Sequence, residues 1–290
     1  MDSRPVKGIL LMRRKILSVI IAMLMTAVLA LPAAASPARY ISRVTANGVS
    51  LKGSYDSRLK EVTYTGTCKS NAEPNFPLEL AMLFSSRNVK NQVLAVTTGS
   101  EWLTAGSLSD MAGSGKIARM TFRLTDEKGK PYRNETNFIA KNGRVTGSDM
   151  AMSREKSGLS ENFYNSFTYD GNGNLLSYEV DSSNPITYRF TWENGLPVSA
   201  SGSNVAAGRS ETYQFTSEGK KIIQADCKSG YQTWIMYFHY NSDGKLSSVT
   251  SKDAKGSTGT VVDHIKYAGN GTVISLRLYG TEYQFEYKTI

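Results

Sequence analysis

Hydrophobic and polar residues alternate with a period of two along most of the C-terminal half of the chain. The alternation is clearest in the segments 176–181, 186–193 and 283–287, where aromatic and aliphatic residues occupy every second position. A helix would distribute these side chains around its axis, whereas a strand gathers them on one face. The pattern therefore predicts β-strands that each bury one face. The segment 234–240 is apolar on both faces, which predicts a strand buried on both sides.

Short polar turns that contain glycine separate these strands. Asn-Gly and Asp-Gly pairs reach a positive φ at low cost, so they close hairpins between twisted strands. The order of aromatic strand, polar turn and alternating strand occurs five times from Phe167 onward, and such a repeat indicates units that bury their apolar faces on one another. The turn residues that the pattern singles out are Asp170, Gly173, Gly195, Gly219, Asp243, Gly244 and Gly271.

The spacing of the turn glycines increases along the chain, from 22 residues between Gly173 and Gly195 to 27 between Gly244 and Gly271. This drift favours a meander of unequal hairpins over a regular solenoid. Degenerate copies of the repeat extend it back to about Lys116. We therefore expect an all-β fold, an antiparallel meander of repeated β-hairpins that forms an extended sheet able to curl, with residues 116–290 as its repeat region.

Residues 36–115 predict a separate, mainly β region. The segments 42–51 and 60–65 indicate strands, while Pro77 followed by an apolar run to Phe84 is compatible with a short helix or a buried strand, of which we favour the strand. The stretch 99–116 is rich in Gly and Ser and is typical of a loop. It marks the expected boundary with the repeat region.

The N-terminus has the pattern of a secretory signal peptide, residues 1–35. Basic residues up to Lys15 precede an uncharged apolar run over 16–31, and small residues follow at 33–35. The alternative, a retained membrane anchor, needs a longer run to cross a hydrocarbon core of about 30 Å. We therefore expect an exported protein, secreted or associated with the envelope, without a stable membrane span after the signal is removed.

Charge and cysteine content narrow the classes of partner and compartment. Removal of residues 1–35, which hold five basic residues and one acidic residue, lowers the net charge from +9 to +5, and the remaining basic residues are dispersed. A nucleic-acid footprint is not indicated. Two cysteines, Cys68 and Cys227, are compatible with one disulfide in an oxidising compartment or with two separate thiols. A disulfide closing so long a loop would stabilise by about 4 to 5 kcal/mol.

One turn carries a family resemblance. The run Tyr169 to Leu175 resembles the tyrosine-aspartate unit of Rhs/YD-repeat proteins, and the run Tyr240 to Leu246 is similar, with Asn in place of the Asp. The other copies depart further, because they keep the aromatic residue or only the glycine. The resemblance implies an exported array of antiparallel hairpins that can curl into a shell.

Candidate chemistry is sparse. His239 and His264 lie in predicted strands, and the neighbouring Asp263 is expected on the face opposite His264, which argues against a His-Asp relay. The run Asp170 to Asn174 offers oxygen ligands but lacks the later Glu of a helix-loop-helix calcium site. No cofactor or metal motif is present. Aromatic rings that could stack on sugars or pack in a core are Trp102, Trp192 and Trp234.

These observations favour an exported, non-enzymatic β-repeat protein that acts as a scaffold or interaction surface in the bacterial envelope or extracellular space, with a protein or glycan partner and no cofactor. A carbohydrate-binding module that uses exposed Tyr and Trp rings is one alternative. A secreted hydrolase with an acidic pair is the other, because glycoside hydrolysis needs two carboxylates at a set separation.

Overall fold

The computed structural model describes residues 37–46, 48–69, 76–86, 88–98, 115–141, 143–154, 159–181, 185–204 and 208–290. Residues 38–290 form one compact unit. The predicted signal peptide, Trp102 and most of the Gly/Ser-rich loop lie outside the described residues.

The described residues form seventeen strands and two helices. In chain order they are β1 (Arg39–Ala46), β2 (Val49–Asp56), β3 (Glu61–Cys68), α2 (Phe76–Phe84), α3 (Val89–Thr98), β4 (Arg119–Asp126), β5 (Pro131–Lys141), β6 (Arg144–Arg154), β7 (Leu159–Tyr169), β8 (Leu175–Asp181), β9 (Ile186–Glu193), β10 (Leu196–Asn204), β11 (Arg209–Glu218), β12 (Lys221–Ser229), β13 (Gln232–Tyr240), β14 (Leu246–Asp253), β15 (Thr258–Tyr267), β16 (Val273–Leu278) and β17 (Thr281–Thr289).

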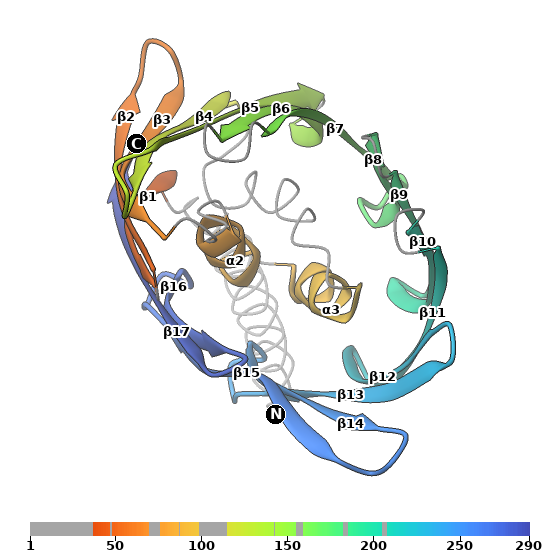
Figure 1. The fold of residues 1–290 in the computed structure, drawn as a ribbon. Coiled ribbons are helices and arrows are strands. Elements are labelled where there is room, and N and C mark those ends of the chain that lie inside the picture. Colours follow the sequence, from red (N-terminus) through yellow and green to blue (C-terminus); the bar gives the residue numbers. More distant parts are fainter. Residues whose placement is uncertain are drawn as a thin grey trace, which may run out of the picture. The chain divides into compact units, whose positions relative to one another are not determined.

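The strands form a closed sheet. Each strand pairs with the next in sequence, and β17 pairs with β1 to complete the ring seen in Figure 1. Every pair is antiparallel except β3–β4. In a ring of antiparallel pairs the strand directions alternate, so an odd number of strands requires a parallel pair. A parallel pair needs a crossover connection, and the segment between β3 and β4 contains both helices.

The prediction of an all-β antiparallel hairpin meander is confirmed, but the extended sheet is wrong, because the sheet closes on itself. Pairing of β1 with β17 satisfies the N–H and C=O groups that two open edges would expose. The expected boundary near residue 115 falls within the compact unit, and β1–β3 share the sheet with the later strands.

The strand favoured for residues 77–84 is wrong, since this segment is helix α2. Pro77 suits the first helical turn, where its missing N–H costs no hydrogen bond. Residues Pro77 to Phe84 are all buried, Glu79 included, so the helix is buried on every side and shows no amphipathic period. Helix α3 was not foreseen either. Neither helix in the described part of the chain is long and apolar enough to cross a membrane.

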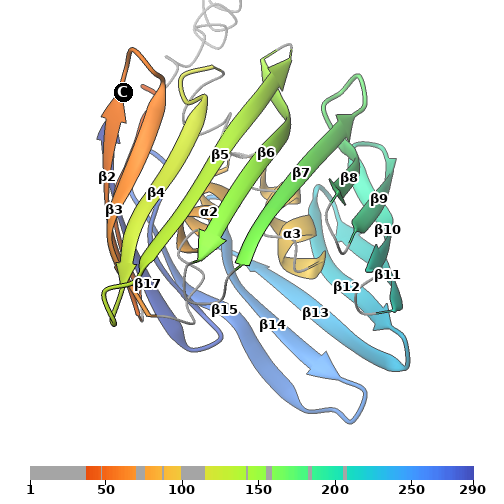
Figure 2. The same ribbon diagram turned by 45° about the horizontal axis from the view of Figure 1, so that its top comes forward.

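Both helices lie inside the ring (Figures 1 and 2). Helix α2 packs against β1 and β16, and α3 packs against β10 and β12. Polar contacts attach them to the wall: the Ser85 hydroxyl accepts from the Val273 N–H at 3.1 Å, and the Lys90 ammonium donates to the Gly195 carbonyl. The inward side chains of the strands and the two helices together form the core.

Candidate functional site

Polar side chains form cross-strand rows on the outer face of β3–β6. On β4, the inward residues Met120, Phe122 and Leu124 are buried in the core, so the residues between them face outward. The register places Arg119 between Glu61 on β3 and Asn137 on β5. The same register makes one row of outward side chains from β3 to β6.

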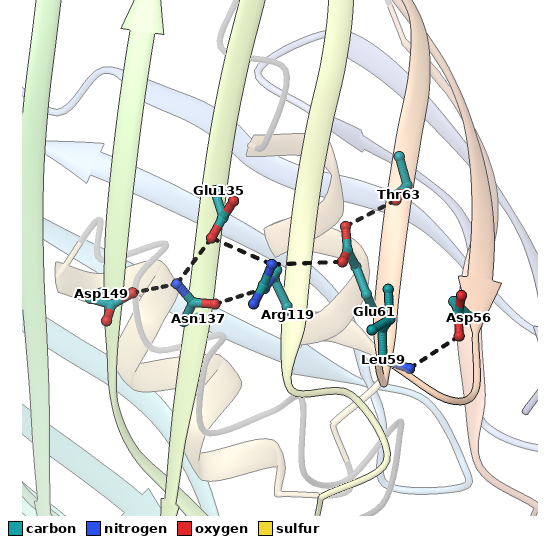
Figure 3. A network of polar contacts seen from close by, with 8 residues as sticks. All are labelled: Asp56, Leu59, Glu61, Thr63, Arg119, Glu135, Asn137 and Asp149. Atoms are coloured by element: carbon teal, nitrogen blue, oxygen red, sulfur yellow. Dashed lines mark hydrogen bonds and ion pairs between the residues drawn. The ribbon is translucent and has the colours of Figure 1, made fainter.

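The first row is a closed polar network centred on Arg119 (Figure 3). The Arg119 Nε donates to Asn137 Oδ1 at 3.0 Å, and its Nη1 lies 3.9 Å from Glu61 and 3.7 Å from Glu135. The amide of Asn137 in turn donates to Asp149 Oδ1 at 2.8 Å. Arg119 is therefore engaged with groups of the protein, among them the Glu135 carboxylate.

Next to this network lies a groove of about 570 Å³, which we call the β4–β7 groove. Its floor is low because Ala151 and Ser153 are small. Arg123 and Arg133 are directly opposite each other across β4 and β5, and both are exposed. The side chains that face the groove are those of Thr121, Arg123, Pro131, Arg133, Glu135, Ala151, Ser153 and Asn162.

The β4–β7 groove has an unbalanced positive charge. Like charges directly opposite each other destabilise a sheet, and within the described residues no carboxylate lies in ion-pairing range of Arg123 or Arg133. Glu135, the one carboxylate of the lining, is engaged by Arg119. In addition, the Thr121 hydroxyl is buried and has no hydrogen-bond partner in the protein. Two exposed guanidinium groups that face each other can hold a carboxylate, sulfate or phosphate.

An exposed aromatic ring borders the groove. Tyr164 on β7 is 56% exposed, and the register places it opposite Asp149. It thus continues the Arg119 row and lies two residues from Asn162 of the groove lining. An exposed tyrosine face is the kind of surface on which a sugar ring stacks.

A second outer groove, of about 510 Å³, lies over β11–β14 and contains Asp226 and Asp253. The two carboxylates have different partners. Asp253 Oδ1 accepts from the N–H groups of Lys255 and Ser257 at 2.9 and 2.8 Å, as a turn residue does, and Asp226 accepts from the Gln224 amide at 3.2 and 3.1 Å. Both carboxylates are therefore held by hydrogen bonds from the protein.

The turn motif has a structural explanation. Asp170 Oδ1 accepts from the Asn174 N–H at 2.8 Å, and Gly173, at φ 85°, donates to the Asp170 carbonyl. The Asn174 side-chain amide donates to Asp170 Oδ2 at 2.8 Å, and this bond, followed by that of the Asn174 N–H, lowers the pKa of Asp170. Asn241 makes the same turn with Lys245. The other predicted turn glycines also have positive φ, namely Gly195, Gly219, Gly244 and Gly271, and Asp243 donates its N–H to Asn241 Oδ1.

In four repeat units the aromatic residue before the turn bonds to the preceding hairpin, and Tyr287 on the last strand makes the same kind of bond, whereas the unit around Gly219 has Ser217 at this position. The O–H or N–H of the aromatic residue donates to the carbonyl of the aliphatic residue that follows the previous turn. In three of these cases a Lys or Arg side chain also lies over the ring of the donor tyrosine. The five donor and acceptor pairs are Tyr169 and Val145 (3.2 Å), Trp192 and Leu175 (2.7 Å), Tyr240 and Ile222 (2.7 Å), Tyr267 and Leu246 (3.0 Å), and Tyr287 and Val273 (2.7 Å).

The remaining predicted site residues lie mainly in or beside the core. Trp192 and Trp234 are half-buried and pack against the core, so neither presents an exposed ring face on which a sugar could stack. Cys68 on β3 and Cys227 on β12 are buried, and the structure keeps them as two thiols rather than one disulfide. Burial, with Asp226 and Glu211 nearby, raises the pKa of Cys227 to about 12. Within the described ranges no group of His, Cys, Asp and Glu could hold a metal ion.

The argument that separated Asp263 from His264 is wrong. His264 has φ 50° at an irregularity in the β15–β16 register, and its Nδ1 lies 3.0 Å from Asp263 Oδ1. Arg277 holds the same carboxylate through Nε at 2.8 Å and Nη2 at 2.6 Å, and it is the main reason why the pKa of Asp263 is far below its usual range. His239 is exposed and lies 3.3 Å from the Thr250 hydroxyl.

Comparison with known proteins does not assign the chain to a family. No protein-family model matches the chain, and no curated protein matches it. The likeness to YD repeats therefore remains a resemblance of the turn sequences.

Proposed function

We propose that the protein is an exported, non-enzymatic binding protein whose closed sheet is a rigid scaffold and whose β4–β7 groove binds an acidic glycan of the envelope or the extracellular space. The observation that carries the proposal is the facing pair Arg123 and Arg133 beside the unpartnered Thr121 hydroxyl. An anionic group held between the two guanidinium groups would remove the like-charge repulsion.

The rest of the lining supports a sugar rather than a protein partner. A protein interface is normally anchored by large apolar or aromatic side chains in its centre, and Pro131 is the one apolar ring that faces the groove. Hydroxyl, amide and carboxylate groups from Ser153, Asn162 and Glu135 offer both donors and acceptors to sugar hydroxyls. Tyr164 extends this surface with an exposed ring. Support for export comes from the basic and apolar N-terminal segment.

The test is calorimetric titration with a uronic-acid hexamer and with a neutral glucose hexamer. We expect the acidic hexamer to bind, with an affinity that falls as salt is added, and the double variant Arg123→Gln/Arg133→Gln to bind it ten-fold or more weakly. The matched control is Arg189→Gln, an exposed arginine on β9 that lies 3.9 Å from Glu179 and should bind as the wild type does. Absence of binding, or equal loss in the control, would overturn the proposal. Equal binding of both hexamers would show that charge is not recognised.

A further inference from the structure

Positively charged side chains form a row across the outer face of strands β1 to β5, of which β2 to β5 lie side by side in Figure 2. The register aligns Arg43 on β1 with Lys52 on β2, and Lys52 with Thr65 on β3. It then aligns Thr65 with Arg123 on β4, and Arg123 with Arg133 on β5. All five side chains are exposed, and we call them the basic row. The row therefore continues the β4–β7 groove, which contains Arg123 and Arg133, to the far side of β3.

The charges of the basic row are largely unbalanced. In the part of the chain that the structure describes, no carboxylate lies in ion-pairing range of Lys52, Arg123 or Arg133. The Nη1 of Arg43 lies 3.6 Å from Glu286, but both side chains are more than 60% exposed. Water screens such a pair, so an anionic ligand can take the place of Glu286. The row thus offers four cations to one ligand.

Hydroxyl groups flank the basic row on both sides. Their side chains point outward, because they alternate with the inward residues of the same strands. Hydroxyls both donate and accept hydrogen bonds, as the hydroxyls of a sugar require, whereas the bases of a single-stranded nucleic acid bind by stacking on aromatic rings. On β2, β3 and β4 the flanking positions are Ser50, Ser54, Thr63, Thr67, Thr121 and Thr125.

An acidic row on the same face indicates the direction of the ligand. The register places four carboxylates in the row of Arg119, four residues along the strands from the basic row, namely Asp56, Glu61, Asp149 and Asp181. At about 3.3 Å per residue the two rows are about 13 Å apart. A polyanion that followed a strand would meet these like charges, whereas one that crosses the strands stays on the basic row. From β1 to β5 this path covers four inter-strand steps, or about 19 Å.

We propose that the basic row extends the β4–β7 groove into a site for the inner part of a linear acidic glycan that carries an anionic group on successive sugars. This proposal rests on the proposed function, because the groove holds the first of these anionic groups. A single terminal acidic sugar would engage Arg123 and Arg133 alone. Several anionic groups on one chain can use all four cations, and each contact after the first is intramolecular, which raises the affinity with chain length.

The test is calorimetric titration of the full mature chain with a uronic-acid dimer and with the hexamer. We expect the hexamer to bind at least about ten-fold more tightly. Lys52→Gln should weaken the hexamer at least about three-fold and leave the dimer unchanged, because the dimer is held in the groove. Thr65→Lys should strengthen the hexamer by a similar factor, because it fills the gap in the row. The matched controls are Lys228→Gln on β12 and Thr233→Lys on β13, two exposed residues that face each other in the register and should bind both oligomers as the wild type does.

The outcomes separate this proposal from the proposed function. Equal affinity for dimer and hexamer, or equal binding of the hexamer by Lys52→Gln and the wild type, would overturn the extended site. The groove itself would still stand if Arg123→Gln/Arg133→Gln lost the dimer. No binding of either oligomer would overturn both proposals. Tighter binding of a thymidine hexanucleotide than of the uronic-acid hexamer would make the ligand a nucleic acid and overturn the glycan. All four variants change exposed side chains, so melting temperatures equal to that of the wild type should accompany these results.

Discussion

Replacement of Gly202 by alanine should break a polar cluster inside the ring. Gly202 on β10 lies between Tyr188 on β9 and Glu211 on β11 in the sheet register. Because Gly202 has no side chain, the Tyr188 ring lies across β10, and its O–H donates to the Glu211 carboxylate at 2.7 Å. Tyr213 and Ser229 donate to the same carboxylate at 2.6 and 3.2 Å.

The magnitude follows from the space that a methyl group would meet. A Cβ at Gly202 would lie 2.2 Å from Tyr188 Cε1 and 2.5 Å from Cδ1, so the ring must move by about 1 Å to reach ordinary contact at 3.4 Å. Displacing a buried ring costs about 1–3 kcal/mol, and losing a hydrogen bond to a charged acceptor costs about 1.5–3 kcal/mol. The better strand propensity of alanine offsets roughly 0.5–1 kcal/mol. We expect a net loss of about 3 kcal/mol.

The assay is urea unfolding followed by circular dichroism, with Gly259→Ala as the matched control. Gly259 is also a strand glycine without positive φ, and its nearest neighbour to an added Cβ is Ser251 Oγ at 3.7 Å, so this variant should be as stable as the wild type. In a Tyr188→Leu background, where the ring is gone, Gly202→Ala should cost little. Equal stability of the two glycine variants, or the same cost in both backgrounds, would refute the steric argument.

Three further predictions concern other parts of the ring. Tyr240→Phe should lower the unfolding free energy by about 1 kcal/mol, because it leaves a strand carbonyl without its donor, while the same change at the fully exposed Tyr231 should have no effect in urea titration. The Cys227 thiol should resist alkylation at pH 8 in the folded protein and react after unfolding, as mass spectrometry would report, since its pKa is raised to about 12; rapid labelling of the native state would contradict this. The pKa of Asp263 is lower in the folded than in the unfolded state, so its ionised carboxylate stabilises the fold. This stabilisation is complete above the unfolded pKa of about 3.9 and is lost as the pH falls towards the folded pKa. Asp263→Asn should therefore cost about 1 kcal/mol at pH 7, a modest value because Arg277 is 39% exposed, and this cost should shrink below pH 4. A cost independent of pH would exclude the ion pair as its cause.

The strands and hairpins were readable from the sequence because their signals are local. Alternation identifies a strand facing a core, and an Asn-Gly or Asp-Gly pair identifies its turn. Closure of the sheet is not local, since β1 and β17 are separated by most of the chain. Helix α2 was not predicted for a related reason. It is buried on all sides inside the ring, and a short apolar run of this kind fits a buried strand equally well.

The β4–β7 groove could have been found in part. The strand around residues 120–124 and the turn at 127–129 were both visible in the sequence, and counting outward from that turn places Arg123 opposite Arg133. Two arginines directly opposite each other destabilise a sheet, and this cost was the feature of the sequence that could have indicated a binding site for an anion. The burial of the Thr121 hydroxyl and the engagement of Glu135 by Arg119 depend on neighbouring strands, so no sequence pattern reports them. The bulge that turns His264 towards Asp263 is likewise invisible to an argument from strict alternation.

The aromatic residue and the Asp of the tyrosine-aspartate unit have different structural roles. This explains why the copies lose the Asp more often than the aromatic residue. The Asp or Asn acts within its own turn, where another residue can replace it: in the turn that begins at Ala268, Asn270 Oδ1 accepts from the Thr272 N–H at 3.0 Å instead. The aromatic residue acts between hairpins, because it supplies a donor to a carbonyl of the preceding unit. Trp192 and Tyr267 keep that donor although their units have lost the Asp. Contacts between successive hairpins help to hold a closed sheet together, and the donor is accordingly kept in more units than the Asp, although the unit around Gly219 has Ser217 at that position.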